Sequence, residues 1–189
     1  MDNSLDGLNL RPANINDLSL IVNLHNSNFL REKENYKEQG FLLERINIQD
    51  IKKEISDPEK KYYVLINKSN NILGYVSLAN NIDNSIISYV EWEGNFDKKL
   101  IYSKKHKYLA VLVIDKNYTG LGLAQYIYKQ LFEKYPGSIF TAFIATNPFK
   151  NRKSLDFHYK QGFIIGGRFR KDNFCGLKNY KSLFLYKKT

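Results

Sequence analysis

The chain has 189 residues, of which 43% are hydrophobic and 25% charged, so it can form one domain with a substantial core and is not disordered throughout. Its single cysteine, Cys175, excludes an internal disulfide and a cysteine-rich metal site, and it favours a reducing compartment. The net charge is +10, and residues 150–189 alone carry eleven Lys or Arg against two Asp, which favours a polyanion or a phosphate-rich cofactor as partner unless the basic surface serves only solubility.

The N-terminal third of the chain predicts a short strand and two helices. The opening MDNSLDGLNL lacks the basic and apolar regions of a signal peptide, and no apolar run approaches the ~18 residues that span a bilayer, so we expect a cytoplasmic protein. A strand is expected over residues 8–13. Apolar residues at helical spacing predict helices over 16–26, with Asn16 as a cap, and over 47–57. The polar stretch 31–41 is expected to be a surface loop or a frayed helix.

The middle of the chain predicts a hairpin and a strand–helix–strand unit. Residues 61–67 and 72–79 are strand-like and are joined by the turn KSNN. The segment 80–104 fits no clear pattern. Apolar runs over 108–115 and 138–145 flank a helical pattern, and we expect the two strands to be parallel and connected by a right-handed crossover.

The C-terminal part predicts a helix over 151–161 and strands over 163–170 and 180–187. No internal repeat or low-complexity linker divides the chain. The elements therefore predict one α/β (α+β) domain with a mixed sheet over residues 1–189, with its core at about 8–187.

A glycine-containing turn, DKNYTGLGLA, joins the strand 108–115 to the helix that begins near Leu121 or Gly122. Glycine permits a sharp turn and a close approach of a ligand, and the first amides of a helix have no partner within the helix. The turn is therefore either a plain tight connection, with Asp115 as a turn or cap residue, or a site for a phosphate or pyrophosphate. A Walker A loop is excluded because no Gly-Lys-Ser/Thr follows. The dinucleotide fingerprint is excluded because Ala124 replaces its third glycine and the next strand contains no acid.

Two segments resemble motifs of the GNAT acetyltransferases. TGLGLA, residues 119–124, resembles motif A, whose pattern is Gln/Arg-x-x-Gly-x-Gly/Ala, except that Thr119 replaces the usual Gln or Arg. NPFKNRKSLDFHYKQGF resembles the closing signature of the family. Its residues in the expected register are Asn151, Ser154, Phe157, Gly162 and Phe163. The resemblance covers about residues 8–187 and implies a central mixed, mostly antiparallel sheet of six to seven strands flanked by about four helices.

The resemblance implies acetyl-CoA as cosubstrate and no metal. By resemblance, the amides of the glycine turn hold the pyrophosphate, and the end of the preceding strand lies along the pantetheine arm and offers a backbone N–H to the thioester oxygen. The cofactor-binding residues implied in this way are Leu112, Val113, Ile114, Thr119, Gly120, Leu121, Gly122, Leu123, Ala124, Asn151 and Ser154. The basic side chains expected to attract the phosphates of CoA are Lys150, Arg152 and Lys153.

The reaction implied by the resemblance is direct attack of an amine on the thioester, so Cys175 is not required as a nucleophile. The usual leaving-group acid is a Tyr seven residues after the signature Asn, and here His158 occupies that position, followed by Tyr159. A phenol with a reference pKa of about 10 is a better proton donor at neutral pH than an imidazole at about 6.5, so chemistry favours Tyr159 and register favours His158. The alternative that both only pack stays open. Glu91, beside Trp92 in VEWEG, is a candidate general base, with water as the alternative.

The acceptor is expected near the connection between the first two helices and the segment 80–104, with Tyr36, Phe41 and Trp92 as candidates for the pocket wall. It can be a polyamine, an aminoglycoside, a protein N-terminus or a lysine. A catalytically silent acyl-CoA-binding protein and a basic nucleic-acid-binding module are alternative functions, and the second is disfavoured because no nucleic-acid-binding motif is present. No membrane partner is expected, and a homodimer is left open.

Overall fold

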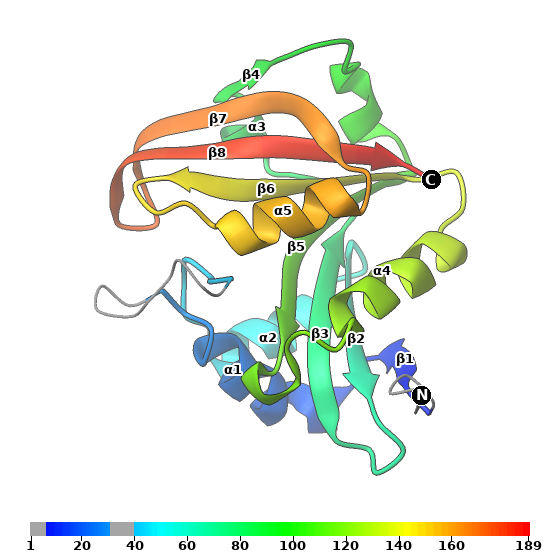
Figure 1. Ribbon diagram of the computed structural model, residues 1–189. Helices are drawn as coiled ribbons and strands as arrows, with labels where there is room; N and C mark the ends of the chain where they lie inside the picture. Colours follow the sequence, from blue (N-terminus) through cyan, green and yellow to red (C-terminus); the bar gives the residue numbers. More distant parts are fainter. Residues whose placement is uncertain (1–6, 31–39) are drawn as a thin grey trace. The chain divides into compact units, whose positions relative to one another are not determined.

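The structure, a computed structural model, describes residues 7–30 and 40–189 (Figure 1). Contacts within the chain divide it into two compact units, each built from three segments of sequence. The first unit comprises Met1–Asn28, Arg45–Ala79 and Leu109–Pro136, and the second comprises Phe29–Glu44, Asn80–Tyr108 and Gly137–Thr189.

The first unit is a small sheet with helices. Its described elements are β1 (Asn9–Pro12), α1 (Leu18–Asn26), α2 (Ile48–Ile55), β2 (Lys60–Ile66), β3 (Ile72–Ala79), the end of β5 (His106–Ile114) and α4 (Leu123–Lys134). β1 pairs antiparallel with β2, and β2 pairs antiparallel with β3. The backbone N–H of Asp115 donates to the carbonyl of Leu73 at 2.8 Å, so the end of β5 lies beside β3.

Two neighbouring tyrosines of β2 show how this sheet is covered. The hydroxyl of Tyr62 hydrogen-bonds to Glu54 of α2, whereas the hydroxyl of Tyr63 hydrogen-bonds to that of Tyr135, at the end of α4, at 2.6 Å. Successive side chains of a strand point to opposite faces, so α2 and α4 cover opposite faces of the sheet (Figure 1). This two-sided cover explains why β2 and β3 are nearly continuous buried runs.

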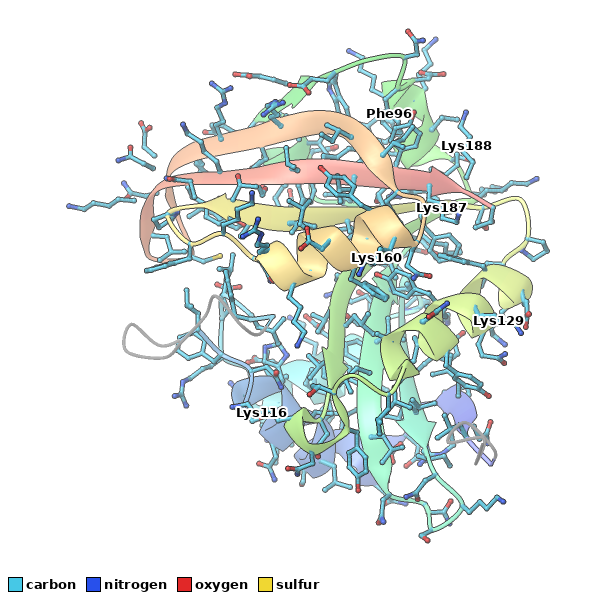
Figure 2. All side chains as sticks on the ribbon, in the orientation of Figure 1. Phe96, Lys116, Lys129, Lys160, Lys187 and Lys188 are labelled. Carbon is cyan, nitrogen blue, oxygen red and sulfur yellow. The ribbon has the colours of Figure 1, made fainter. Side chains whose placement is uncertain are left out.

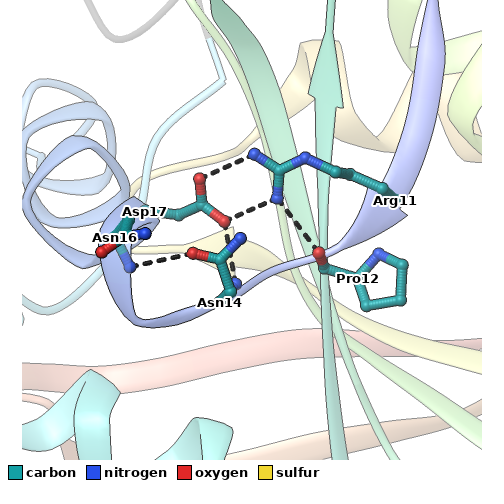
Figure 3. Close-up of polar contacts among 5 residues, drawn as sticks. All are labelled: Arg11, Pro12, Asn14, Asn16 and Asp17. Atoms are coloured by element: carbon teal, nitrogen blue, oxygen red, sulfur yellow. Dashed lines mark hydrogen bonds and ion pairs between the residues drawn. The ribbon is translucent and has the colours of Figure 1, made fainter. Parts of the chain in front are cut away.

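The start of α1 differs from the expected one. The cap is Asn14, whose side chain accepts the N–H of Asn16 at 2.9 Å and opens a 3₁₀ turn, η1 (Ile15–Asp17). Asn16, the expected cap, lies inside this turn. Arg11 of β1 donates two hydrogen bonds to Asp17 at 2.7 and 2.9 Å (Figure 3), and these bonds lower the pKa of the Asp17 carboxyl. The ion pair ties the first strand to the first helix.

The second unit is an antiparallel sheet extended by one parallel strand. Its described elements are α3 (Asn84–Ile87), β4 (Val90–Trp92), η2 (Lys98–Tyr102), the start of β5, β6 (Ile139–Asn147), α5 (Arg152–Lys160), β7 (Ile164–Phe174) and β8 (Leu177–Lys188). β5 pairs parallel with β6, as the strand–helix–strand pattern predicted. The β6–β8, β8–β7 and β7–β4 pairs are antiparallel.

The side chains of two consecutive residues of β8 point to opposite faces of this second sheet. Phe184 belongs to a buried aromatic cluster that also contains Phe96, Phe169 and Tyr180. Leu185 is also buried but points to the opposite face, over which α5 lies (Figure 1). The sheet is thus covered by aromatic side chains on one face and by α5 on the other.

Across the described residues the hydrogen-bonded strand order is β1-β2-β3-β5-β6-β8-β7-β4, and the described α-helices number five. The mixed, mostly antiparallel α/β class is confirmed, with about four helices expected and five described, whereas six to seven strands were too few. The additional elements are α3 and β4, four and three residues long, which are too short for periodicity to reveal. The single-domain boundary stays a prediction.

Candidate active site

The glycine turn after β5 contains two left-handed residues. Asp115 caps the 3₁₀ turn η3 (Lys116–Tyr118), which agrees with its expected role as a turn or cap residue. Gly120 and Gly122 follow with φ of 84° and 77°, and Gly122 is the N-cap of α4. A side chain at such φ values costs about 1–2 kcal/mol, so glycine is favoured at both positions.

The same two glycines leave open space at the start of α4. A Cβ placed on Gly120 or Gly122 would meet no atom within 4 Å. No side chain caps α4, and no backbone hydrogen bond from the amides of residues 120–124 to the described part of the chain is present. Unpaired amides and the positive end of a helix dipole attract an anion. We call residues 120–124 the glycine cradle.

Thr119 and Leu121 contribute differently from the glycines. The hydroxyl of Thr119 donates to the carbonyl of Lys116 at 3.1 Å, so it serves the turn itself. The side chain of Leu121 is exposed, whereas Leu123, the first residue of α4, is buried and Ala124 is half-buried. The donors of the cradle are therefore backbone N–H groups. The side chain at position 119, where the family usually has Gln or Arg, is used within the turn.

A third glycine, which the sequence analysis missed, shapes the end of β5. A Cβ at Gly74 of β3 would lie 2.6 Å from the carbonyl oxygen of Val113 and 2.7 Å from Cδ1 of Ile114. Val113 is buried, and Leu112 and Ile114 are half-buried. Gly74 interrupts the apolar strand ILGYVSLA, and a glycine within a strand is a signal of close backbone approach.

Asn151, an expected cofactor-binding residue, forms hydrogen bonds with both the oxygen and the nitrogen of its side-chain amide. It is 8% exposed and caps α5, since its Oδ1 accepts the N–H of Ser154 at 3.3 Å. Its Nδ2 donates to the carbonyl of Phe41 at 3.1 Å. The amide of Asn151 is therefore used to hold other parts of the second unit.

His158 is packed inside the second unit. It is 4% exposed, and its ring meets Phe163 edge to face at a centroid distance of 5.1 Å. Its Nδ1–H donates to the carbonyl of Ser154 at 2.7 Å. Burial lowers the pKa of His158 to about 4, so the ring is neutral at pH 7 and holds its one proton in that bond. A neutral imidazole in this state is a poor proton donor.

Tyr159, the next residue of α5, is 41% exposed. Arg168 of β7 has its pKa raised first by the hydrogen bond to Glu93 of the β4 segment and, to a smaller extent, by the charges of Tyr159 and Glu91. The bond between Arg168 and Glu93 joins β7 to the end of β4. Arg168 was missed by the sequence analysis, although alternating arginines in GRFR are a visible signal of an exposed strand face.

Glu91, the candidate base, lies on β4 with its side chain exposed to solvent. Its carboxylate is 3.6 Å from the guanidinium of Arg170, also on β7. Glu93 pairs with Arg168 in the same way, so both glutamates share one face of the sheet, as their alternation with Trp92 predicts.

Two of the three candidates for the acceptor wall, Phe41 and Trp92, lie in the aromatic cluster of the second unit. Phe41 is buried there, and Trp92 packs against it, with its ring stacked on Phe96 at 5.3 Å between centroids. Tyr36 lies outside the described residues.

The surroundings of Cys175 and of His106 keep both side chains uncharged at neutral pH. Cys175 occupies the tight β7–β8 turn with φ of 49°, and burial, followed by the charge of Glu44, raises its pKa to about 12, so the thiol stays protonated. His106 is fully buried between the hydroxyl of Thr141 (2.8 Å) and the carbonyl of Asn80 (3.2 Å), and burial lowers its pKa to about 4. Within the part of the chain that the structure describes, no three His, Cys, Asp or Glu side chains gather as metal ligands would.

The expected basic residues Lys150, Arg152 and Lys153 are exposed around the start of α5. At the other end of the helix lies Lys160, the last residue of α5 (Figure 2), and Nζ of Lys187 would be 3.0 Å from a Cβ on Gly162. None of the helices in the described ranges is long and apolar enough to cross a membrane.

The structure distributes the expected site residues between the two units. The whole glycine cradle, Thr119 and the end of β5 belong to the first unit. Asn151, Ser154, His158, Tyr159 and Glu91 belong to the second.

Comparisons with known proteins agree with the fold and with the motifs. A model of the acetyltransferase (GNAT) family matches residues 21–163. The spermidine N-acetyltransferase of Vibrio cholerae, solved in complex with CoA and spermine, has 17% sequence identity and a TM-score of 0.66, covering 96% of this chain and 95% of that one. A putative phosphinothricin N-acetyltransferase has 21% identity and a TM-score of 0.64, covering 96% and 98%. No curated protein matches the sequence.

The two structural matches have low identity and show a shared fold. The family model goes further, because its matched region contains both the glycine cradle and the Asn151–Phe163 signature, on which the resemblance was based. The chain therefore belongs to the acetyltransferase (GNAT) family.

Proposed function

We propose that the chain transfers the acetyl group of acetyl-CoA directly to a primary amine and that the glycine cradle binds the pyrophosphate of the cofactor. The observation that carries the proposal is the pair Gly120 and Gly122, both with positive φ and both open to space at the uncapped start of α4. The cradle offers backbone N–H donors to an anion without any side chain. The end of β5, over Leu112–Ile114, then offers backbone to the pantetheine arm and an N–H that polarises the thioester carbonyl.

The amine attacks the thioester directly, without a covalent enzyme intermediate. The amine nitrogen forms a bond to the carbonyl carbon, the C–S bond breaks, and the phenol of Tyr159 gives its proton to the departing thiolate. The proton released by the amine passes to the Glu91 carboxylate or to water. Tyr159 is assigned as the acid because it is exposed, whereas the proton of His158 is held by the carbonyl of Ser154. Cys175 takes no part, since its thiol is not ionised.

The acceptor is a primary amine, and a polyamine is one candidate, because the Vibrio cholerae enzyme was solved with spermine. We place the reaction in the cytoplasm, in keeping with a single cysteine. The test is a thiol-release assay with acetyl-CoA and a panel of polyamines, aminoglycosides, amino acids and peptides. We expect saturable release of CoA with at least one amine. Binding of CoA without turnover across the whole panel would favour the silent acyl-CoA binder.

Replacing Gly122 by Asp tests the cradle. Asp and Asn both tolerate the left-handed conformation better than other side chains, so Gly122→Asn and Gly122→Asp share the backbone cost and differ in charge. A carboxylate beside the pyrophosphate repels it, and we expect Gly122→Asp to bind CoA about 30-fold more weakly than Gly122→Asn by calorimetry.

The matched control for this pair is Gly176→Asp. Gly176 lies in the β7–β8 turn with φ of 73°, and a Cβ placed on it would also meet no atom within 4 Å. The control carries the same strain and charge outside the cradle and should bind CoA as the wild type does. Equal CoA affinities of Gly122→Asn and Gly122→Asp would show that the pyrophosphate binds elsewhere.

A further inference from the structure

The segment 98–107 of the second unit is strongly basic. Its sequence, KKLIYSKKHK, contains five lysines and no acidic residue. It forms η2 and the start of β5, and Lys98, Lys99, Lys104 and Lys105 are exposed. None of these four lysines forms an ion pair with a residue of the described ranges. Their positive charges are therefore available to another molecule.

Tyr102 lies between the two lysine pairs in the sequence, and its ring is in solvent. It is 66% exposed, whereas the preceding Ile101 is 3% exposed and anchors η2 in the aromatic cluster. The hydroxyl of Tyr102 donates to Oδ1 of Asn84 in α3 at 3.4 Å. The ring is therefore tethered at its hydroxyl end and leaves aromatic surface uncovered, on which a planar ligand can stack.

The end of β8 adds a further positive charge beside this segment. His106 pairs with Ile139, and Ile139 pairs with Lys188, so Lys188 lies two strand spacings, about 10 Å, from the start of β5. Phe96, two residues before η2, packs against Tyr186 of β8 at 4.6 Å between ring centroids. Lys188 is exposed at the end of β8 (Figure 2). We define the lysine–tyrosine surface as Lys98, Lys99, Tyr102, Lys104, Lys105 and Lys188.

The acidic side chains that precede this surface in the sequence are engaged elsewhere. Asp97 caps η2 by accepting the N–H of Lys99 at 3.0 Å. Glu91 and Glu93 pair with arginines of β7. The surface therefore keeps a net positive charge, and a negatively charged partner is expected to bind there.

The position of Tyr102 among the lysines selects the kind of partner. Proteins that bind single strands combine lysines along the phosphate backbone with aromatic rings on which bases stack. An acidic polypeptide would use the lysines alone. A membrane surface would require exposed aliphatic side chains, but Leu100 is half-buried and Ile101 is buried.

We propose that the lysine–tyrosine surface binds a single-stranded segment of nucleic acid, with phosphates on the lysines and a base stacked on Tyr102. This surface is additional to the acetyltransferase function and is built within the second unit. The sequence contains no nucleic-acid-binding motif because the surface combines η2 with the ends of two strands, and Lys188 is 83 positions from Lys105.

Replacing Tyr102 tests the stacked base. The probe is a fluorescein-labelled single strand about 12 nucleotides long, oligo(U) RNA or oligo(dT) DNA, titrated with the full chain and followed by anisotropy. We expect micromolar binding at low salt. Tyr102→Ala should weaken binding of both strands about tenfold, whereas Tyr102→Phe, which keeps the ring, should bind as the wild type does. The control is Tyr89→Ala, which removes another exposed tyrosine of the second unit and should leave the affinity unchanged.

Neutralising Lys104 and Lys105 tests the phosphate contacts. In the double variant Lys104→Gln/Lys105→Gln, the slope of log K against log salt concentration should become shallower by about 1.4, because each phosphate contact with a single strand contributes about 0.7. The matched control is Lys52→Gln/Lys53→Gln, a neighbouring pair of exposed lysines on α2 in the first unit. It should leave the slope unchanged.

Competition experiments separate this inference from its rivals, and no acceptor amine is needed, so the result is independent of the proposed function. If polyglutamate, or vesicles of phosphatidylglycerol and phosphatidylcholine, displace the labelled strand as well as unlabelled strand does at equal charge, the surface recognises charge alone and the inference is overturned. Release of the strand by saturating CoA would assign the lysines to the cofactor site and overturn it too. Wild-type affinity in Tyr102→Ala also overturns it.

Discussion

Replacing Tyr159 by Phe is expected to lower kcat about 100-fold, the usual contribution of a general acid, with little change in KM for acetyl-CoA. The ring and its packing are kept, and only the proton donor is removed. The measurement is steady-state thiol release between pH 6 and 10, with the best amine of the panel.

Tyr89→Phe is the matched control for this variant. Tyr89 is an equally exposed tyrosine of the second unit, with Lys171 over its ring, and we expect its replacement to leave kcat unchanged. Replacement of His158 by Gln tests the competing acid. A loss of about 100-fold in His158→Gln, together with an active Tyr159→Phe, would move the proton donor to His158 and refute our assignment.

Acidification is expected to destabilise the protein between pH 6.5 and 4.5 through His106 and His158, two of its three buried histidines. The pKa of His106 and that of His158 are both about 4 in the folded state, mainly because of burial, against about 6.5 in the unfolded chain. Below pH 6.5 the unfolded state therefore binds more protons, and the free energy of unfolding falls as the pH is lowered. Each histidine accounts for about 3 kcal/mol once the pH reaches 4.

Urea unfolding at half-unit pH steps measures this loss. His106→Gln and His158→Gln each remove one titrating group, so each should remove about half of the pH dependence that these two histidines contribute between 6.5 and 4.5. Asp17 titrates in a lower window, because Arg11 lowers the pKa of its carboxyl and its contribution is lost only as the pH falls through that lowered value. A pH dependence that is unchanged in both histidine variants would contradict the prediction.

Much of the fold could be predicted because its signals are local. The hairpin of β2 and β3, the parallel pair β5 and β6 and the helices α2, α4 and α5 lie within a few residues of their expected bounds. The first cap was misplaced by two residues, because Asn14 and Asn16 are both good cap residues and the choice depends on Arg11 holding Asp17. Such a contact with a strand is invisible to local patterns.

Some features of the candidate site could likewise be predicted from local sequence, and others could not. The glycine cradle is a local motif, and its left-handed residues lie where the sequence placed the turn. The state of His158 could not be predicted, since its burial depends on Phe163 and on the sheet beneath α5. The surroundings of Glu91 depend on Arg170, 79 positions away in the chain, and only the pairing of β4 with β7 brings the two together.

The edge strand β4 has a consequence for self-association. It is three residues long, it ends the strand order, and Glu91 within it and Glu93 just after it pair with arginines of β7. A short, charged edge offers another molecule few backbone groups for pairing, so further molecules cannot readily extend the sheet at this end into a fibre. Because exposed ion pairs are screened by salt, this protection against aggregation weakens as ionic strength rises.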